Sequence, residues 1–339
     1  SELSELTGIQ KPILNDVIKG KRSLTPEMAL LLENALGISA TYLMNIQTQY
    51  ELDCAKQSER VVLQTKMLEI WNILKDQVSI QFFRKVNIVR GNIIEDVKRI
   101  FEVFNVDKLD DFLELKAKEM ELSYYRKSDK VKTNPIDILS WKYYCYHLSK
   151  NDESKLCAFD KDADVNALTS ELNGAFRVNK NTVNVTKSIL NKYGIRFLIV
   201  NKVGQVPVDG MSFWIDESPT IIITERIASI DNFAFTTLHE VGHVFKHLTP
   251  NGRAMINLVE EKKSIEESEA DEFALNAILP HTDWKRFMTR TRDVVPYKIA
   301  PHIKEEADKH NLNPQLLFGR YKHDIGIYKI KNFFETKIQ

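Results

Sequence analysis

Hydrophobic positions follow two different periodicities along the chain. Before Gly194, apolar residues recur at spacings of three and four, which predicts helices. After Gly194, two short runs rich in β-branched residues, 195–200 and 220–224, predict strands. Helical spacing returns from about Asn232 onward. We therefore predict an α+β protein, with helices alone in the N-terminal half and a small sheet with helices beside it in the C-terminal part.

Residues 1–50 have the pattern of several short helices. Pro12 is tolerated only in the first turn of a helix, so one helix is predicted to begin near Gln10. Thr25 followed by Pro26 is a second start signal, and that helix is predicted to end at Gly37. Helices this short bury little surface singly and must pack as a bundle. Ile13, Leu14, Val17 and Ile18 are predicted to form the buried stripe of the first of these helices. The next helix runs through Met28, Leu31, Leu32 and Leu36, and another follows from Ser39 through Leu43 and Ile46.

The pattern remains helical up to about residue 150, with a polar stretch at 128–135 that ends in a proline and is predicted to be a loop. We predict three domains, with limits at 1–58, 59–160 and 161–339. The apolar positions that carry the helical pattern in the middle region are Leu68, Trp71, Leu74, Val97, Ile100, Phe101 and Phe104.

The composition of the chain argues against several classes of protein. Lys+Arg and Asp+Glu number 47 each, so no overall charge attracts nucleic acid, and DNA binding must come from a local patch. The three cysteines have no metal-ligand spacing and fit reduced thiols in a cytoplasm better than a disulfide framework. No run approaches the roughly 18 apolar residues of a membrane helix. We expect a cytoplasmic protein without a membrane span.

The strongest chemical signal is His239-Glu240-Val241-Gly242-His243. At 3.6 residues per turn, the two histidines project from one helix face and can bind one metal ion. Glu240 is displaced by about 100° around the helix, where it can reach a metal-bound water without binding the metal. Zinc lowers the pKa of such a water and a carboxylate can take its proton, which is the chemistry of peptide hydrolysis. The alternative is two helical histidines beside an unrelated acid.

His247 fails as a third ligand on geometry. It lies eight residues after His239, about 12 Å along a straight helix, too far for both to bind one ion at about 2.1 Å. Lys246 and Thr249 occupy the positions at which the metzincin pattern has Gly and His. His247 is predicted to contact the ligands or line the pocket, or else to be a surface histidine.

A later acidic segment, 265–279, offers better candidates for the third ligand. Its apolar residues share one helix face, and Glu267 lies closer to that buried direction than Glu269 does. We therefore expect Glu267 to bind the metal. Asp271, four residues on, could orient a ligand histidine through its outer nitrogen. The alternative is a solvated acidic face.

These segments resemble the ImmA/IrrE family of metallopeptidases. The family hallmark is His-Glu-x-Gly-His followed by Glu-x-x-Ala-Asn/Asp-x-Phe-Ala, matched here by 239–243 and 267–274. The resemblance implies a zincin-like domain in which His239, His243 and Glu267 hold zinc and Glu240 is the general base. Members of the family are known or suspected to cleave a partner transcriptional repressor. The resemblance extends through Gly210–Trp214, Asp231–Thr236, Leu279–Pro280 and Asn313–Arg320, with a weaker supporting match at Tyr125–Ser128.

The N-terminal segment resembles the helix-turn-helix of XRE-type regulators and HigA-like antitoxins, through 7–10, 15–22 and 24–30. The chain begins where the second helix of such a module starts, so its first helix is expected to be missing. Because 1–50 carry four basic and five acidic residues, the alternative is a small bundle used for dimerisation. In the DNA-binding interpretation, Gln10, Lys11 and Asn15 reach base edges, and Lys19, Lys21 and Arg22 contact phosphate.

Our first hypothesis is a transcriptional regulator with a zinc-dependent endopeptidase domain that acts on a protein partner, such as a repressor or a toxin–antitoxin component. The second is a DNA-binding antitoxin or repressor whose zinc domain is structural or sensory, and the third is an interaction scaffold. A homodimer fits either regulator. The strand pair near 210–224 could bind an extended peptide by edge addition, and His247 is a candidate for stabilising the oxyanion.

Overall fold

A computed structural model describes residues 2–124, 134–201, 208–225, 227–250, 252, 254–258 and 264–339. The chain forms two compact units, Ser1–Ile73 and Leu74–Gln339. The match at 125–128, and the predicted loop at 128–135 as far as residue 133, lie outside the described residues. The predicted domain limits stay predictions.

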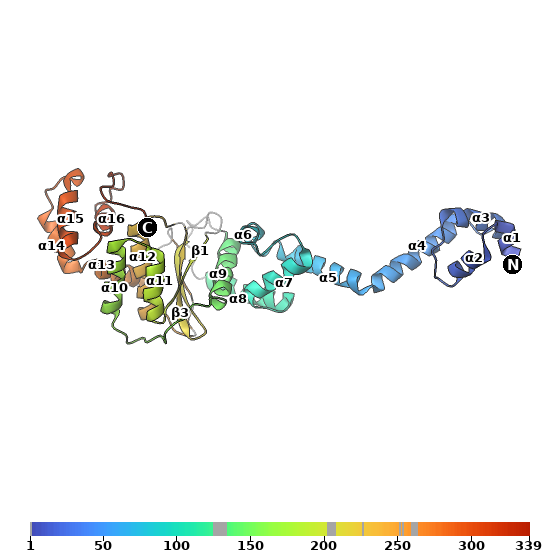
Figure 1. The fold of residues 1–339 in the computed structure, drawn as a ribbon, viewed down its shortest axis with the longest axis horizontal. Helices are drawn as coiled ribbons and strands as arrows, with labels where there is room; N and C mark the ends of the chain where they lie inside the picture. Colours follow the sequence, from blue (N-terminus) through green and yellow to red (C-terminus); the bar gives the residue numbers. More distant parts are fainter. Residues whose placement is uncertain are drawn as a thin grey trace. The chain divides into compact units, whose positions relative to one another are not determined.

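The first unit is helical throughout, as predicted (Figure 1). Pro12 lies in the first turn of its second helix. The Thr25 hydroxyl accepts a hydrogen bond from the Met28 amide and so caps the third helix, which ends at Gly37 with a left-handed φ of 68°. The helices are α1 (Glu2–Thr7), α2 (Lys11–Ile18), α3 (Pro26–Leu36), α4 (Ala40–Gln57) and all but the last residue of α5 (Glu59–Leu74).

The core of this unit is smaller than the sequence pattern predicts. It consists of Ile9, Leu14, Met28 and Leu32, with Ile13, Val17 and Leu43 half-buried around it. A bundle of such short helices buries only a narrow stripe of each helix, and side chains one position off that stripe reach solvent. The prediction of burial was therefore wrong for Ile18, which is exposed. Leu31, Leu36 and Ile46, which carry the apolar pattern of the next helices, are exposed as well.

The second unit begins with a group of helices, the last of which covers one face of a sheet. The region is helical, as predicted, and Val97, Ile100, Phe101 and Phe104 are buried on α7, whereas Leu68, on α5 in the first unit, is exposed. Helix α9 packs against β1 and β2. The helices are α6 (Ile80–Lys85), α7 (Ile93–Phe104), α8 (Leu109–Tyr124) and α9 (Pro135–Lys150).

The described strands form one sheet in the order β1-β3-β2-β4. Strand β1 runs parallel to β3, and β2 is antiparallel to both β3 and β4. The two predicted strands are present as β1 and β3. The strand pair at 210–224 is interior, so the prediction that a peptide adds to its edge was wrong. The strands are β1 (Arg196–Val200), β2 (Val208–Ile215), β3 (Ser218–Thr224) and β4 (Met255–Leu258).

Helix α12 lies on the opposite face of the sheet from α9. Phe213 of β2 meets Tyr146 of α9, with ring centroids 4.4 Å apart, whereas Gly210 of the same strand meets Glu240 of α12. Residues of opposite parity face opposite sides of a strand. The remaining helices are α10 (Val165–Val178), α11 (Thr182–Lys192), α12 (Ile230–Lys246), α13 (Ile265–Ile278), α14 (His281–Arg290), α15 (Ala300–Lys309) and α16 (Pro314–Asp324), with a 3₁₀ turn at Pro296–Lys298.

The C-terminal core lies between the sheet and helices α10, α12, α13, α15 and α16. Within the described part of the chain, no helix is both long and apolar enough to cross a membrane.

Candidate metal centre

Helix α12 is buried around most of its circumference, and it carries His239, Glu240 and His243 into the interior. Their exposed fractions are 1%, 0% and 0%. A buried polar side chain needs a partner, because its loss of hydration costs free energy. These three residues therefore require compensating contacts from other elements.

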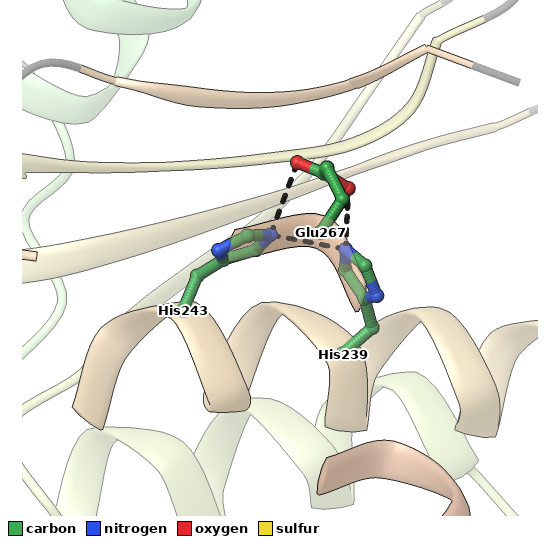
Figure 2. Close-up of side chains that lie close together, drawn as sticks. All are labelled: His239, His243 and Glu267. Carbon is green, nitrogen blue, oxygen red and sulfur yellow. Dashed lines mark hydrogen bonds and ion pairs between the residues drawn. The ribbon is translucent and has the colours of Figure 1, made fainter. Parts of the chain in front are cut away.

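Glu267 supplies contacts to both histidines. The Ser264 hydroxyl accepts a hydrogen bond from the Glu267 amide and so caps α13, which fixes Glu267 in the first turn of that helix. Its carboxylate oxygens lie 3.2 Å from Nε2 of His239 and 3.3 Å from Nε2 of His243. Figure 2 shows this carboxylate reaching from a neighbouring helix to both rings.

The donor set fits zinc. The two Nε2 atoms are 3.1 Å apart, and ligands bonded at about 2.1 Å in a tetrahedral arrangement lie roughly 3.4 Å from one another. Two imidazoles and one carboxylate leave a fourth position for water or substrate, as in hydrolytic zinc sites. Among the described residues, His239, His243 and Glu267 form the group whose ligand atoms all lie within 4.8 Å of one another.

The outer nitrogens of the two histidines also have partners. Nδ1 of His239 lies 2.9 Å from an oxygen of Asp271. Nδ1 of His243 lies 2.9 Å from Nδ1 of His247, whose Nε2 lies 2.9 Å from Glu269. Such contacts fix ring orientation and leave each Nε2 directed toward the Glu267 carboxylate. Both nitrogens of His247 are engaged in these contacts, so it is not placed to donate a hydrogen bond to an oxyanion.

Glu240 lies between α12 and the central strand β2. A Cβ added at Gly210 would overlap Oε1 of Glu240, so only glycine leaves room for this carboxylate. Among the described residues, neither Glu240 oxygen has a hydrogen-bond partner of good geometry. The hydroxyl of Ser212, which is buried on the same face of β2 as Gly210, is near enough to lower the pKa of this carboxylate. An acid with unsatisfied oxygens beside a possible metal position is placed to receive a proton.

The pKa values of Glu240 and Glu267 are shifted in opposite directions. Burial raises the pKa of Glu240 to about 8, although the charge of His239 and the nearby Ser212 hydroxyl lower it. Burial also acts to raise the pKa of Glu267, but hydrogen bonds and charge from His239 and His243 outweigh it and bring the pKa to about 2. Glu267 is therefore ionised, as a ligand must be, and Glu240 is basic enough to hold a proton.

The pKa of His239 is raised to about 10 in the protein without metal. Burial opposes its protonation, but hydrogen bonds to Asp271 and Glu267, together with the charges of Glu240 and Glu267, outweigh that effect. A cation placed at Nε2 would neutralise the same acidic surroundings.

Helices α12 and α13 approach closely at Gly242. A Cβ at this position would lie 3.0 Å from Cδ1 and 3.2 Å from Cβ of Phe273. The glycine thus lets α13 bring its acids to the histidines of α12.

The six residues predicted to contact DNA are all exposed, on α2 or directly beside it. They are Gln10, Lys11, Asn15, Lys19, Lys21 and Arg22. They belong to the first unit, and the candidate metal ligands belong to the second.

Comparison with known families agrees with this division. A helix-turn-helix model matches residues 1–43. A peptidase-family model, described as the IrrE N-terminal-like domain, matches residues 191–310, which include every residue of the candidate metal centre. This chain joins a helix-turn-helix to an IrrE-like domain. The resemblance inferred from the motifs is thereby confirmed. A search of curated proteins returned no match.

Sequence reasoning did not assign roles to three residues of the IrrE-like domain. Gly210 and Ser212 affect the site through contacts with Glu240, on a helix about 30 residues away in the sequence. No residue spacing in the sequence predicts these contacts. Glu269 was placed on the less buried side of α13, where it is half-exposed but still contacts His247. The match at Gly210–Trp214 was the signal that could have directed attention to β2.

Proposed function

We propose that the chain is a cytoplasmic transcriptional regulator whose IrrE-like domain is a zinc-dependent endopeptidase acting on a protein partner. The helix-turn-helix supports a DNA-binding regulator, and the peptidase-family match supports a peptidase-like domain. The observation that carries the proposal is the convergence of His239, His243 and Glu267, with the unpaired carboxylate of Glu240 beside them.

In this proposal His239, His243 and Glu267 hold zinc, and Asp271 and His247 orient the two imidazoles. Zinc, when bound, supplies a Lewis acid that polarises the scissile carbonyl and acidifies water. Glu240 accepts a proton from the attacking water and then donates it to the leaving amine, a dual role that its raised pKa favours. Gly210 leaves room for the Glu240 carboxylate.

The substrate would bind as an extended segment. Because β2 and β3 are interior, the edge available on the β2 side of the sheet is that of β4. We propose that β4, rather than the strand pair at 210–224, pairs with the peptide backbone. Main-chain pairing would hold many sequences, and side-chain pockets would select among them.

The helix-turn-helix would bind DNA through α2. Gln10, Lys11 and Asn15 are proposed to read base edges, while the three basic residues at the end of the helix contact phosphate. Those basic residues are Lys19, Lys21 and Arg22.

The deep burial of Glu240 favours a second candidate, in which zinc is structural or sensory and the chain acts as a DNA-binding repressor or antitoxin. In this case the carboxylate would have no access to substrate. Operator binding would then be the activity of the chain, and it would not depend on Glu240.

The test replaces Glu240 with Gln in the full chain. We expect wild-type protein loaded with zinc to cleave members of a random peptide library, with products identified by mass spectrometry. Glu240→Gln should bind the same amount of zinc and cleave at least 100-fold more slowly. Glu272→Gln, at an exposed position on α13, is the matched control. Equal cleavage by Glu240→Gln and wild type would contradict the proposed role of Glu240.

A further inference from the structure

The outer nitrogen of His243 is connected to the protein surface through two side chains. Its Nδ1 contacts Nδ1 of His247, and Nε2 of His247 contacts Oε2 of Glu269, each at 2.9 Å. His247 caps the C-terminus of α12, and Glu269 lies on α13. The contacts run outward, because the His243 and His247 side chains are 1% and 8% exposed and that of Glu269 is 50% exposed.

The direction of these hydrogen bonds follows from the donor capacity of imidazole. Two ring nitrogens can hydrogen-bond to each other only when one carries a proton and the other has a free lone pair. A histidine that binds a cation through Nε2 carries its proton on Nδ1. His243 is therefore the donor and Nδ1 of His247 the acceptor. The proton of neutral His247 then lies on Nε2, which donates a hydrogen bond to the Glu269 carboxylate.

We propose that Glu269 is a positioning residue for the metal site. Through His247 it selects the tautomer of His243 that presents a free Nε2 lone pair, an inference that rests on the zinc site proposed above. Without the Glu269 carboxylate as acceptor, the His247 tautomer with its proton on Nε2 is less stable. If the proton of His247 lay on Nδ1 instead, it would face the Nδ1 proton of His243. This repulsion would disfavour the tautomer of His243 that binds zinc.

The two helices show the same arrangement at His239, where the acid makes direct contact. Asp271 lies 2.9 Å from its Nδ1. The first turns of α13 thus place an acid for each histidine presented by α12 and its cap. The pairs are Asp271 with His239, Glu269 with His247, and Glu267 with the Nε2 atoms of His239 and His243.

The half-exposure of Glu269 sets the size of the expected effect. Loss of a partner that orients a ligand costs about 10- to 100-fold in metal affinity. Water can partly replace an exposed acceptor, so removal of Glu269 should give a loss at or below the low end of that range. Removal of the buried His247 ring should give a larger one.

Zinc affinity of the metal-stripped full chain, measured by competition with a chromophoric chelator, tests the proposal. We expect Glu269→Ala to weaken binding by about three- to tenfold and His247→Leu by roughly 10- to 100-fold. Glu269→Gln should stay within about twofold of wild type, because its amide oxygen still accepts a hydrogen bond from Nε2 of His247. Glu272→Ala, exposed on the same helix, should bind zinc as wild type does. Unchanged melting temperatures of the metal-free variants would show that folding is intact.

Nitrogen-15 spectra of histidine-labelled, zinc-loaded protein provide a direct readout of the tautomer. His247, assigned from the spectrum of His247→Gln, should be protonated on Nε2 and unprotonated on Nδ1. A proton on Nδ1 of His247 would overturn the proposal. So would equal zinc affinities for Glu269→Ala and Glu272→Ala, a result that leaves the zinc site intact. If wild type binds zinc no better than His239→Ala, both the zinc site and the role of Glu269 are rejected.

Discussion

The carboxylate of Glu240 packs against the backbone of Gly210, so closely that a Cβ on the strand would overlap Oε1. The backbone of Gly210 does not have a left-handed φ, so the glycine is required for space rather than for conformation. The contact joins the central strand to the helix that carries both histidines. It fixes the proposed proton acceptor relative to the proposed ligands.

Replacing Gly210 with Ala should therefore displace the Glu240 carboxylate. We expect peptide cleavage to fall roughly 100-fold, the lower range for loss of a general base. Zinc affinity should change by less than about threefold, because the contacts among His239, His243 and Glu267 do not involve Gly210. Cleavage rates and zinc titrations on the same preparation separate the two effects.

Gly174 provides the control for this substitution. It lies inside α10, and a Cβ there would meet no atom within 4 Å. Gly174→Ala should leave cleavage unchanged and raise the free energy of unfolding by about 0.5–1 kcal/mol, because alanine favours the helix. Wild-type cleavage by Gly210→Ala would show that the close contact does not position Glu240.

Gly242→Ala should have the opposite effect on stability from Gly174→Ala, although both glycines are helical. The added methyl group would press on the Phe273 ring and force α12 and α13 apart. We expect a loss of about 1–3 kcal/mol in the free energy of unfolding. Zinc affinity should fall as well, because Glu267 moves away from the histidines. Chemical denaturation and chelator competition measure these changes, and a stabilised variant would contradict the tight packing.

Zinc should stabilise the second unit selectively. At a free zinc concentration 100 times its dissociation constant, binding adds about 2.7 kcal/mol to the free energy of unfolding. Calorimetry with and without a chelator should show a shift in the transition of Leu74–Gln339, with no shift in that of Ser1–Ile73. His239→Ala should abolish the shift. A zinc effect of equal size in that variant would place the binding site elsewhere.

Substitutions on and beside α2 should distinguish the residues that set the overall affinity for DNA from those that set its sequence specificity. Replacing Lys21 or Arg22 with Ala should weaken binding to all DNA sequences and reduce the salt slope by about 1 each. Asn15→Ala should relax sequence preference at one base pair, by about 1–3 kcal/mol. Binding to an operator selected from random DNA, measured at several salt concentrations, tests both. Lys56→Ala on α4 is the control, and an equal loss there would indicate a general charge effect.

Local periodicity was sufficient to predict the orientation of Glu267. The alanines at 270 and 274 and Ile278 are buried along one face of α13, and the proposed ligand Glu267 lies near that face. The spacing of His239 and His243 depends only on the helical repeat. These features involve residues within a few turns of one another, so the sequence contains the information needed to predict them.

Contacts between distant segments could not be predicted in the same way. The overlap of Gly210 with Glu240 depends on how the sheet packs against α12, and neither segment alone specifies that packing. Strand β4 has only four residues, and its pairing is set by β2. Ile18 fits the apolar spacing of α2 but is exposed because the small N-terminal core does not extend to it.

Anomalous diffraction at the zinc absorption edge, from crystals of the full chain grown with zinc, tests the central claim most directly. We predict one strong peak about 2.1 Å from Nε2 of His239, Nε2 of His243 and a carboxylate oxygen of Glu267. A peak bound by other side chains, or zinc-soaked crystals in which Glu267 faces solvent and these histidines bind no metal, would contradict it.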